Sequence, residues 1–585
     1  MVIFRYIGII GLLIQFVGCS SFSKKGHLLL RESFKEGNFF KAHEILAKLS
    51  PAIEPDSKLL YFMEKGSLWH AQGKYDLSRR YFDRAIDLIK ELYTVRISKK
   101  ITATIISESS DLYYGARFEH SMVYYYQIMN FFMLYKKGST ESRKQIENSL
   151  GKSQTPEIDN EMIQGHTLTK RERMDMLQKA RSTVRAWDSK LNSWKKNLVG
   201  KSFYKDDLLS KVVGAMVHEE TGSRSDRMVA LNLYKDALSL LFRQYNTYKS
   251  LNTKSIKFQK NYSKFSELSE GKVRSTYVHA THYQSKLERF LKIQILRLSS
   301  TLQKKYWNRE VKALGANKEM IAMAKTKKMT NIQVLLNFGL IPERKEKKYF
   351  IGLRGLLKNI KNPATRAAVS SIGGMALTNF AIEILGLEPA PKDASYAAVG
   401  LLSANLAAHH AGIGFSLPII DNPKTDELIW IEIKNERTGK TVSRELNLTN
   451  PLGDMAEQAV EENRNALYAR TGVRVGLKHI AAILTCYKTY HLLKSKIGSF
   501  LAKSAAVLEY TALSKGIASS ESADLRYWGT LPKDIRFSQL YLDPGTYSVV
   551  LRVKSSSGTK ETVLRKISID KKSNGIFINH RISRI

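Results

Sequence analysis

The sequence offers few side chains whose types and spacing could perform catalysis. His218, Glu219 and Glu220 begin like the helix of a zinc protease, in which a second histidine lies four residues after the first. That position is Gly222, so this segment does not supply the second zinc ligand. The sequence also contains no Walker loop for phosphates and no glycine fingerprint for dinucleotides.

Other candidate groups have a suggestive spacing but lack the partners that their chemistry needs. A zinc site usually adds cysteine or carboxylate ligands to histidine, and a Ser-x-x-Lys nucleophile needs a pocket. The groups without such partners are His279 with His282, His409 with His410, and Ser21 with Lys24. The sequence therefore predicts a non-enzymatic protein without metal or cofactor. A cell-wall hydrolase is the alternative, because catalytic residues need not form a sequence motif.

Cys19 is the one residue whose surroundings predict a covalent modification. In Met1–Gly18, Arg5 precedes a mostly apolar stretch from Ile7 to Val17. This layout is typical of a secretory signal and is too short to cross a bilayer of ~30 Å comfortably. The order apolar, apolar, small, cysteine at residues 16–19 resembles the lipobox of bacterial lipoproteins. We expect residues 1–18 to be removed as a signal peptide and Cys19 to carry a diacylglycerol.

Lipid on Cys19 predicts where the protein resides. Two or more acyl chains, such as palmitate, make detachment from a membrane negligible, and residues 19–25 would form a lipidated tether. Ser20 and Ser21 follow the cysteine in place of the aspartate that retains many lipoproteins in the inner membrane. We therefore predict the outer membrane, at its periplasmic face. An uncleaved anchor and an ordinary cleaved signal are the alternatives.

The second cysteine and the charge add two further expectations. Cys486 lies in an apolar helical segment and is predicted to be a buried small hydrophobe. The net charge is +39, from 93 Lys and Arg against 54 Asp and Glu. Outside the cytoplasm this charge favours anionic lipid, lipopolysaccharide or peptidoglycan, not nucleic acid, whose aromatic-basic signature is missing. A basic proteome background is the alternative explanation.

Residues 26–150 predict helical repeats. The turns at Gly37 and Gly73 each lie between two apolar helices, and 73 − 37 gives a spacing of 36 residues, near the ~34 of a tetratricopeptide (TPR) repeat. Such repeats bind proteins in a concave face, whereas an irregular helical bundle would offer no groove. The predicted structural positions of the repeats are Gly37, Ala42, Gly66, Trp69, Gly73, Tyr75, Phe82 and Ala85.

The region 151–329 is helical and basic, and it holds a further TPR-like unit. Its small and aromatic positions are Gly214, Ala230, Tyr234 and Ala237.

Earlier in the chain, the aromatic run Tyr124–Tyr126 could face a ligand, but its helical spacing favours a core position.

Residues 330–585 predict a mixed domain, which makes the expected fold class α+β. Its helices are expected at 454–493 and 497–513, packed on a sheet like that of a β-sandwich. Apolar stretches at 367–387 and 394–420 are predicted as buried or hairpin helices, with membrane contact as the alternative. The expected strands are 331–339, 413–420, 428–434, 442–448, 535–542, 547–554, 561–569 and 575–582.

Three phrases spread over most of the chain form a series: Glu64–Phe82, Tyr114–Tyr126 and Ala523–Tyr547. The series resembles an uncharacterised family of bacterial outer-membrane lipoproteins with an N-terminal tetratricopeptide region. Residues 250–330 and 367–387 depart from that family. The resemblance implies a C-terminal motif that consists of Arg526, Trp528, Leu531, Pro532, Pro544 and Gly545. Trp528 is expected to lock the last helix onto the sheet. A ligand site at Trp528 is the alternative.

These features together predict a membrane-anchored, non-enzymatic scaffold. The helical repeats would recruit an envelope protein, and the family resemblance favours cell-wall or outer-membrane assembly because relatives are encoded beside activators of peptidoglycan synthases. The alternative is a binder of lipopolysaccharide or peptidoglycan that uses the basic surface.

Overall fold

The computed structural model describes most of the chain from Lys24 to Ser583. The described residues are 24–49, 55–98, 112–141, 165–196, 204, 206–243, 245, 248–251, 282–325, 330–352, 412–423, 427–521, 523–555, 558–570 and 575–583. The leader, Cys19 and the apolar stretch 367–387 lie outside these residues, as do most of 394–420 and the histidines at 279, 409 and 410.

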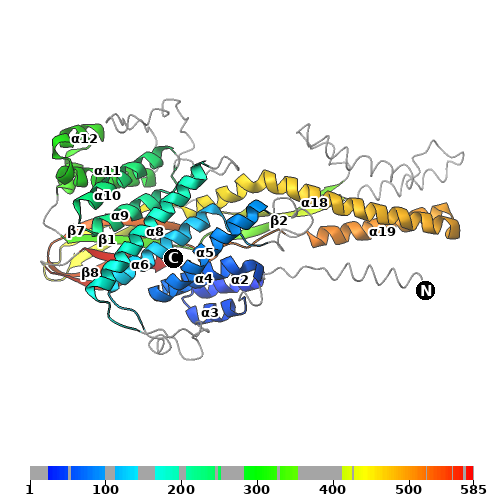
Figure 1. Cartoon of the computed structure of the whole chain (residues 1–585), viewed down its shortest axis with the longest axis horizontal. Coiled ribbons are helices and arrows are strands. Elements are labelled where there is room, and N and C mark those ends of the chain that lie inside the picture. Colours follow the sequence, from blue (N-terminus) through cyan, green and yellow to red (C-terminus); the bar gives the residue numbers. More distant parts are fainter. Residues whose placement is uncertain are drawn as a thin grey trace.

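The first half of the described chain is a series of helices, of which those from α2 to α12 each pack against the next along the sequence, while α13 packs against α11 (Figure 1). These helices are α2 (Lys24–Lys35), α3 (Phe39–Ala47), α4 (Lys58–Ala71), α5 (Tyr75–Ser98), α6 (Arg117–Lys137), α8 (Lys170–Lys196), α9 (Leu208–Glu220), α10 (Arg224–Arg243), α11 (His282–Leu302), α12 (Trp307–Ala313) and α13 (Lys318–Ala324).

Glycines set the close helix pairs. Gly37, Gly73 and Gly222 end helices in the left-handed conformation, with φ of 75°, 73° and 77°, which costs glycine no steric strain. A methyl group on Gly66 of α4 would lie 2.7 Å from the ring of Phe82 on α5. Gly66 and Phe82, two of the positions assigned to the repeats, thus form a close contact between these helices, and Trp69, Ala42 and Ala85 are fully buried in the same core.

Two four-stranded sheets form the second half. The inner sheet has the order β10 (Ile576–Ile582), β1 (Thr330–Phe338), β7 (Asp534–Leu542) and β6 (Asn447–Asn450). The outer sheet has the order β5 (Thr441–Glu445), β4 (Leu428–Asn435), β8 (Gly545–Ser555) and β9 (Gly558–Ile569). A separate two-stranded ribbon joins β2 (Arg344–Gly352) to β3 (Gly412–Ile420).

The two sheets pack face to face through alternate residues. Ile332, Val334 and Leu336 of β1 belong to the same buried cluster as Ile431 of β4 and Leu551 of β8. Side chains alternate between the faces of a strand, so the intervening positions of β1 point the other way, toward the helices. The predicted α+β class with two packed sheets is thus confirmed in its coarse form.

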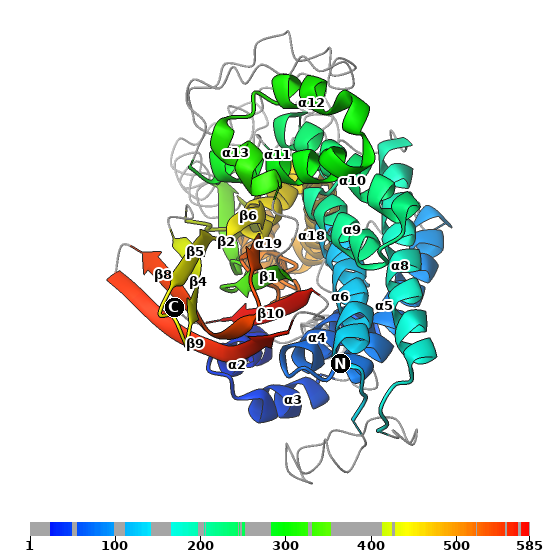
Figure 2. The ribbon, with the colours of Figure 1, turned by 90° about the vertical axis from the view of Figure 1, so that its left-hand side faces the viewer.

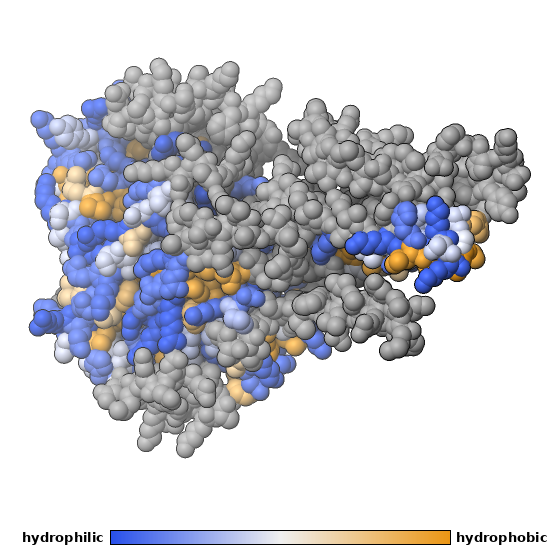
Figure 3. Space-filling view, turned by 45° about the vertical axis from the view of Figure 1, so that its right-hand side comes forward, coloured by the Kyte–Doolittle hydropathy of each residue, from blue (hydrophilic) through white to orange (hydrophobic). Residues whose placement is uncertain are grey.

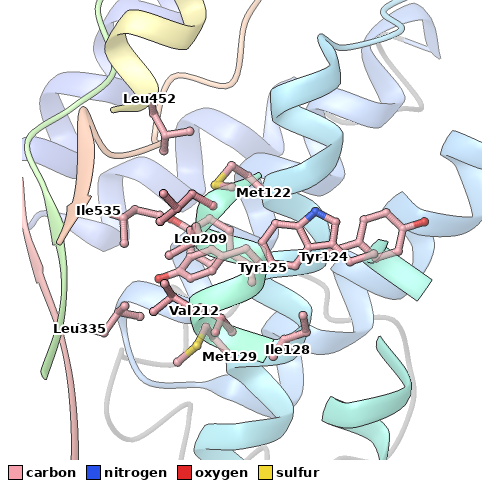
Figure 4. Close-up of a cluster of buried hydrophobic side chains, with 14 of the residues drawn as sticks. Met122, Tyr124, Tyr125, Ile128, Met129, Leu209, Val212, Leu335, Leu452 and Ile535 are labelled. Atoms are coloured by element: carbon pink, nitrogen blue, oxygen red, sulfur yellow. The ribbon is translucent and has the colours of Figure 1, made fainter. Parts of the chain in front are cut away.

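The helices cover the free face of the inner sheet. Leu335 and Ile535 from the sheet share one continuous cluster with Met129 of α6 and Val212 of α9 (Figure 4), and Figure 2 shows the helices beside the sheets. The described helices therefore differ from a free-standing solenoid, because their inner faces are already buried against the sheet. A tetratricopeptide superhelix stays a prediction.

One strand expectation was wrong, and one strand was not expected. The segment 442–448 is not one strand: it divides at Leu446, whose N–H donates to the Ile429 carbonyl at 2.8 Å, and β5 and β6 join different sheets. Leu446 is fully buried between the two sheets, at the point where the chain passes from one sheet to the other. β2 was missed because its lysines hide the alternation of a half-buried strand.

The last two helices form a hairpin that projects from the body (Figure 1): α18 (Leu452–Ile497) and α19 (Ser499–Ser520). Cys486 lies fully buried between them, and burial raises the pKa of its thiol to about 12, which confirms the prediction of an inert core cysteine. Among the described helices, none has the length and apolarity needed to cross a membrane.

We expect Gly66→Ala to destabilise the fold by roughly 1–3 kcal/mol, because the added methyl group displaces the buried Phe82 ring. Gly516→Ala is the matched control, since nothing lies within 4 Å of its added carbon on α19, and alanine should stabilise that helix slightly. Urea unfolding monitored by circular dichroism measures both changes. Equal effects of the two substitutions would contradict the close-contact role of Gly66.

Candidate functional site

The segment Arg526–Leu531 enters the helical layer and lies buried among its side chains. It comes from the C-terminal half, yet it contacts α4 and α6 across more than 400 positions of sequence. We call it the inserted segment. The predicted repeats therefore meet the first part of the predicted C-terminal motif, around Trp528, at one place, which the sequence did not reveal.

Trp528 is the centre of this contact. Its indole is fully buried, and its Nε1 donates to Ser67 Oγ at 2.9 Å. The ring lies 5.7 Å from Phe82 and 5.5 Å from Tyr126, and those two rings stack on each other at 5.3 Å. Trp528 thus packs onto α4, α5 and α6, so the expectation that it locks the last helix onto the sheet was wrong.

Two fully buried carboxylates hold the backbone of the inserted segment. Glu64 accepts from the N–H groups of Gly529 at 2.6 Å and of Thr530 at 3.3 Å, and from the Thr530 hydroxyl. Glu119 accepts from the Trp528 N–H at 2.9 Å and from the Tyr113 hydroxyl at 2.8 Å. A buried carboxylate is stable only when its oxygens are satisfied, so these bonds fix the segment in one position.

Arginines bind the carbonyl groups of the inserted segment. Arg31 of α2 donates to the Gly529 carbonyl at 2.7 Å, and Arg581 of β10 donates to the Thr530 carbonyl at 3.1 Å. Arg526 forms a bidentate pair with Asp524, with both nitrogens at 2.9 Å.

The predicted C-terminal motif divides into two parts in the structure. Leu531 and Pro532 are buried where the segment leaves the helices for the inner sheet, close to Trp528 in the chain. Pro544 and Gly545 lie instead in the turn between β7 and β8, where Tyr547 donates to the Asp543 carbonyl at 2.7 Å. The motif is therefore not one site.

A second buried network, centred on His70, was not predicted. His70 Nδ1 lies 2.7 Å from Asn130 Oδ1, and its Nε2 lies 3.0 Å from Asn579 Nδ2 on β10. Asn579 in turn accepts from Asn337 on β1 at 3.2 Å. Desolvation by burial lowers the pKa of His70 to about 4, so the ring is neutral and ties helices to sheet as a hydrogen-bonding group.

Lys65 is a buried lysine whose described partner is a histidine, not a carboxylate. The side chain is 1% exposed, and its Nζ lies 3.1 Å from His43 Nδ1. Burial lowers the pKa of Lys65 to about 7. The pKa of His43 is also lowered, mainly by burial and to a smaller extent by the charge of Lys65. Trp69 covers the pair, with its ring 4.3 Å from that of His43. Lys65 therefore lies buried in the contact between α3 and α4.

His218, which begins the segment that resembles the helix of a zinc protease, is part of a structural ion-pair network. His218 Nδ1 lies 2.9 Å from Asp226, which also pairs with Arg181. Glu219 pairs with Arg297 at 2.6 Å, and the next glutamate along the chain pairs with Lys136. Within the described ranges, His, Cys, Asp and Glu side chains nowhere gather in the threes that a metal site needs.

An open groove of about 590 Å³ lies between α8, α9 and α10, in the second TPR-like unit. We call it the α8–α10 groove. Gly214 of α9 lets the three helices approach closely beside it, because a methyl group there would lie 3.0 Å from Val184 and 3.2 Å from Leu233. The groove is lined by Val184, Arg185, Asp188, Ser189, Asn192, Ser193, His218, Val229 and Leu233.

The lining of the α8–α10 groove combines an apolar floor with polar edges. Val229 is 40% exposed and contributes apolar surface to the lining. Asp188 is engaged by Lys211, and desolvation lowers the pKa of His218, which leaves that ring neutral at pH 7. Such a surface can hold a short peptide by apolar contact and hydrogen bonds.

Comparison with known proteins gives no relative: no family model, curated protein or solved structure matches this chain.

We expect Trp528→Ala to cost about 3–5 kcal/mol of stability, since it empties a fully buried site at the helix–sheet junction. Trp430→Ala on the half-buried outward face of β4 is the matched control and should cost less. Thermal unfolding of both variants provides the comparison. A smaller loss for Trp528→Ala than for Trp430→Ala would contradict the central role of the inserted segment.

We expect Lys65→Met to stabilise the protein at pH 7 by roughly 1–4 kcal/mol, because it removes a buried lysine without an opposite charge. The folded-state pKa of about 7 lies below the ordinary lysine pKa of 10.5, so the unfolded chain binds more protons between these values and stability rises with pH there. The advantage of methionine should therefore shrink from pH 7 to pH 10. Urea unfolding across this range would refute the idea if the advantage stayed constant.

Proposed function

We propose that this protein is a non-enzymatic scaffold of the bacterial envelope that binds a peptide segment of another envelope protein in the α8–α10 groove. The lipid expected on Cys19 would hold the scaffold at the periplasmic face of the outer membrane. The observation that carries the proposal is an open groove with an apolar floor in a helical layer whose other inner faces are buried against the sheet.

The location of the groove revises the partner surface expected from the repeats. The inner faces of α4, α5 and α6 are occupied by the inserted segment, with Trp528 against Phe82 and Tyr126. An external peptide would have to displace these buried contacts to bind there. The unit formed by α9 and α10 has no inserted segment, and its groove with α8 is open to solvent.

The size and chemistry of the groove suit a peptide. A volume of about 590 Å³ falls within the ~300–1,000 Å³ common for ligand sites. Val184, Val229 and Leu233 offer apolar contact, whereas Ser189 and Asn192 offer hydrogen bonds to a peptide backbone. Arg185 adds a positive charge at the edge, which favours a peptide with an acidic residue.

We expect a photo-crosslinking amino acid at Val229 to capture one or two recurring envelope proteins in living cells. The same amino acid at Val563, which is 73% exposed on β9, is the matched control and should not capture them. Mass spectrometry identifies the adducts of the native lipoprotein.

A second variant links the capture to the groove. Arg185→Glu should abolish the adducts formed at Val229, whereas Lys304→Glu on the far surface near α12 should leave them unchanged. Adducts that recur equally at Val229 and Val563, or that ignore the charge reversal at Arg185, would rule out the groove as the partner site.

A further inference from the structure

The α18–α19 hairpin carries positive charge without any negative charge over its outer length. No acidic residue occurs between Glu462 and Glu509. Lys488, Lys494 and Lys496 are exposed near the turn of the hairpin. The other basic residues in this interval are Arg464, Arg470, Arg474, Lys478 and Lys503.

The same part of the hairpin exposes large apolar side chains. Leu492 is 59% exposed, Ile497 44%, Leu501 56% and Leu508 71%. Leu501 and Leu508 are seven residues apart on α19, so they lie on one face of the helix. Figure 3 shows apolar and polar residues side by side at the outer end of the hairpin.

The core between the two helices of the hairpin is formed by other residues. Its core consists of small and aromatic side chains, with Ala482, Cys486 and Ala502 packed against Tyr490 and Ala506. Leu492, Leu501 and Leu508 do not belong to this core. Large apolar side chains at a projecting end, away from any described packing, are typical of an interaction surface.

The charge distinguishes between the possible occupants of this surface. A second copy of the chain would bring the same lysines against each other, without an acidic residue in the hairpin between Glu462 and Glu509 to pair with them. An anionic bilayer offers both requirements at once: phosphate groups for the lysines and, just beneath them, an apolar layer for the leucines.

We propose that the outer end of the α18–α19 hairpin inserts into the interface of an anionic lipid bilayer. Ile497 and Leu501 enter the acyl boundary, while Lys494 and Lys496 contact the phosphates. The hairpin lies in the interface and does not cross the membrane. This contact is separate from the lipid expected on Cys19 and from the α8–α10 groove, so each can fail without the other.

Figure 1 places α2 at the end of the body from which the hairpin projects. Its Leu28 and Leu29 are 39% and 42% exposed, so this end carries a second, smaller apolar surface. A lipid attached a few residues before α2 would bring the same end toward the bilayer that the hairpin contacts.

Vesicle binding by the full chain with Cys19→Ser tests the proposal without the lipid. The protein should co-sediment with vesicles of equal parts phosphatidylglycerol and phosphatidylcholine, and not with phosphatidylcholine alone. Lys494→Glu with Lys496→Glu should weaken binding at least about tenfold, because each reversal replaces attraction by repulsion. Lys304→Glu with Lys305→Glu, at exposed positions of the body, is the control with the same change in net charge.

A second measurement reports insertion directly and does not depend on the charge variants. An environment-sensitive dye on Ser499→Cys, at the turn of the hairpin, should brighten when anionic vesicles are added. The same dye on Thr559→Cys, exposed on β9, should not respond. Replacing Leu492, Ile497 and Leu501 by serine should abolish co-sedimentation, whereas Val563→Ser on β9 should not.

Three outcomes would overturn the proposal. They are binding that survives the serine substitutions, a dye on residue 499 that ignores the vesicles, and a concentration-dependent dimer that the same substitutions dissolve. The last outcome would assign the surface to a second copy. Circular dichroism of each variant verifies that the hairpin substitutions leave the fold intact.

Discussion

The burial of Glu64 and Glu119 is the constraint on which the arrangement of helices and sheets depends. A carboxylate taken out of water costs several kcal/mol unless its oxygens are fully hydrogen-bonded. The donors here include the backbone N–H groups of Trp528 and Gly529, which belong to the other half of the chain. The helices are therefore complete only when the inserted segment is in place, and the molecule is one body instead of a repeat array joined to a separate domain.

The same constraint explains why the interaction surfaces lie at the margins. The inner faces of α4 to α6 contact Trp528, and the central helices contact the inner sheet, so neither is free for a partner. What remains is the α8–α10 groove in the helical layer and the hairpin that projects from the body (Figure 1). These are the two surfaces for which a peptide and an anionic bilayer are proposed above.

Local sequence patterns predicted the elements well and their assembly poorly. The expected strand segments include β1, β4 and β8, and the positions assigned to the repeats include Gly66 and Phe82, which lie in close contact. The pairing of Trp528 with Ser67 joins residues 461 positions apart, and no local pattern reports such a contact. Polar groups that act in the core, such as His70 and Asn579, were missed because burial is decided by the tertiary fold. The groove was missed for the same reason, although Gly214 had been noticed.

The pairing of β1 with β10 and β7 has a consequence for the order of folding. Ile332 lies between Ile576 of β10 and Leu540 of β7, and both strands follow α19, so β1 has no partner in the inner sheet until the chain beyond α19 is available. Contacts of such long sequence separation slow folding, because a large loop must close before they contribute. Until then the apolar faces of α6 and α9 have no sheet to cover them and attract other chains. A protein exported in unfolded form would therefore need a holding chaperone during this interval, and its sheet would assemble after translocation, not during it.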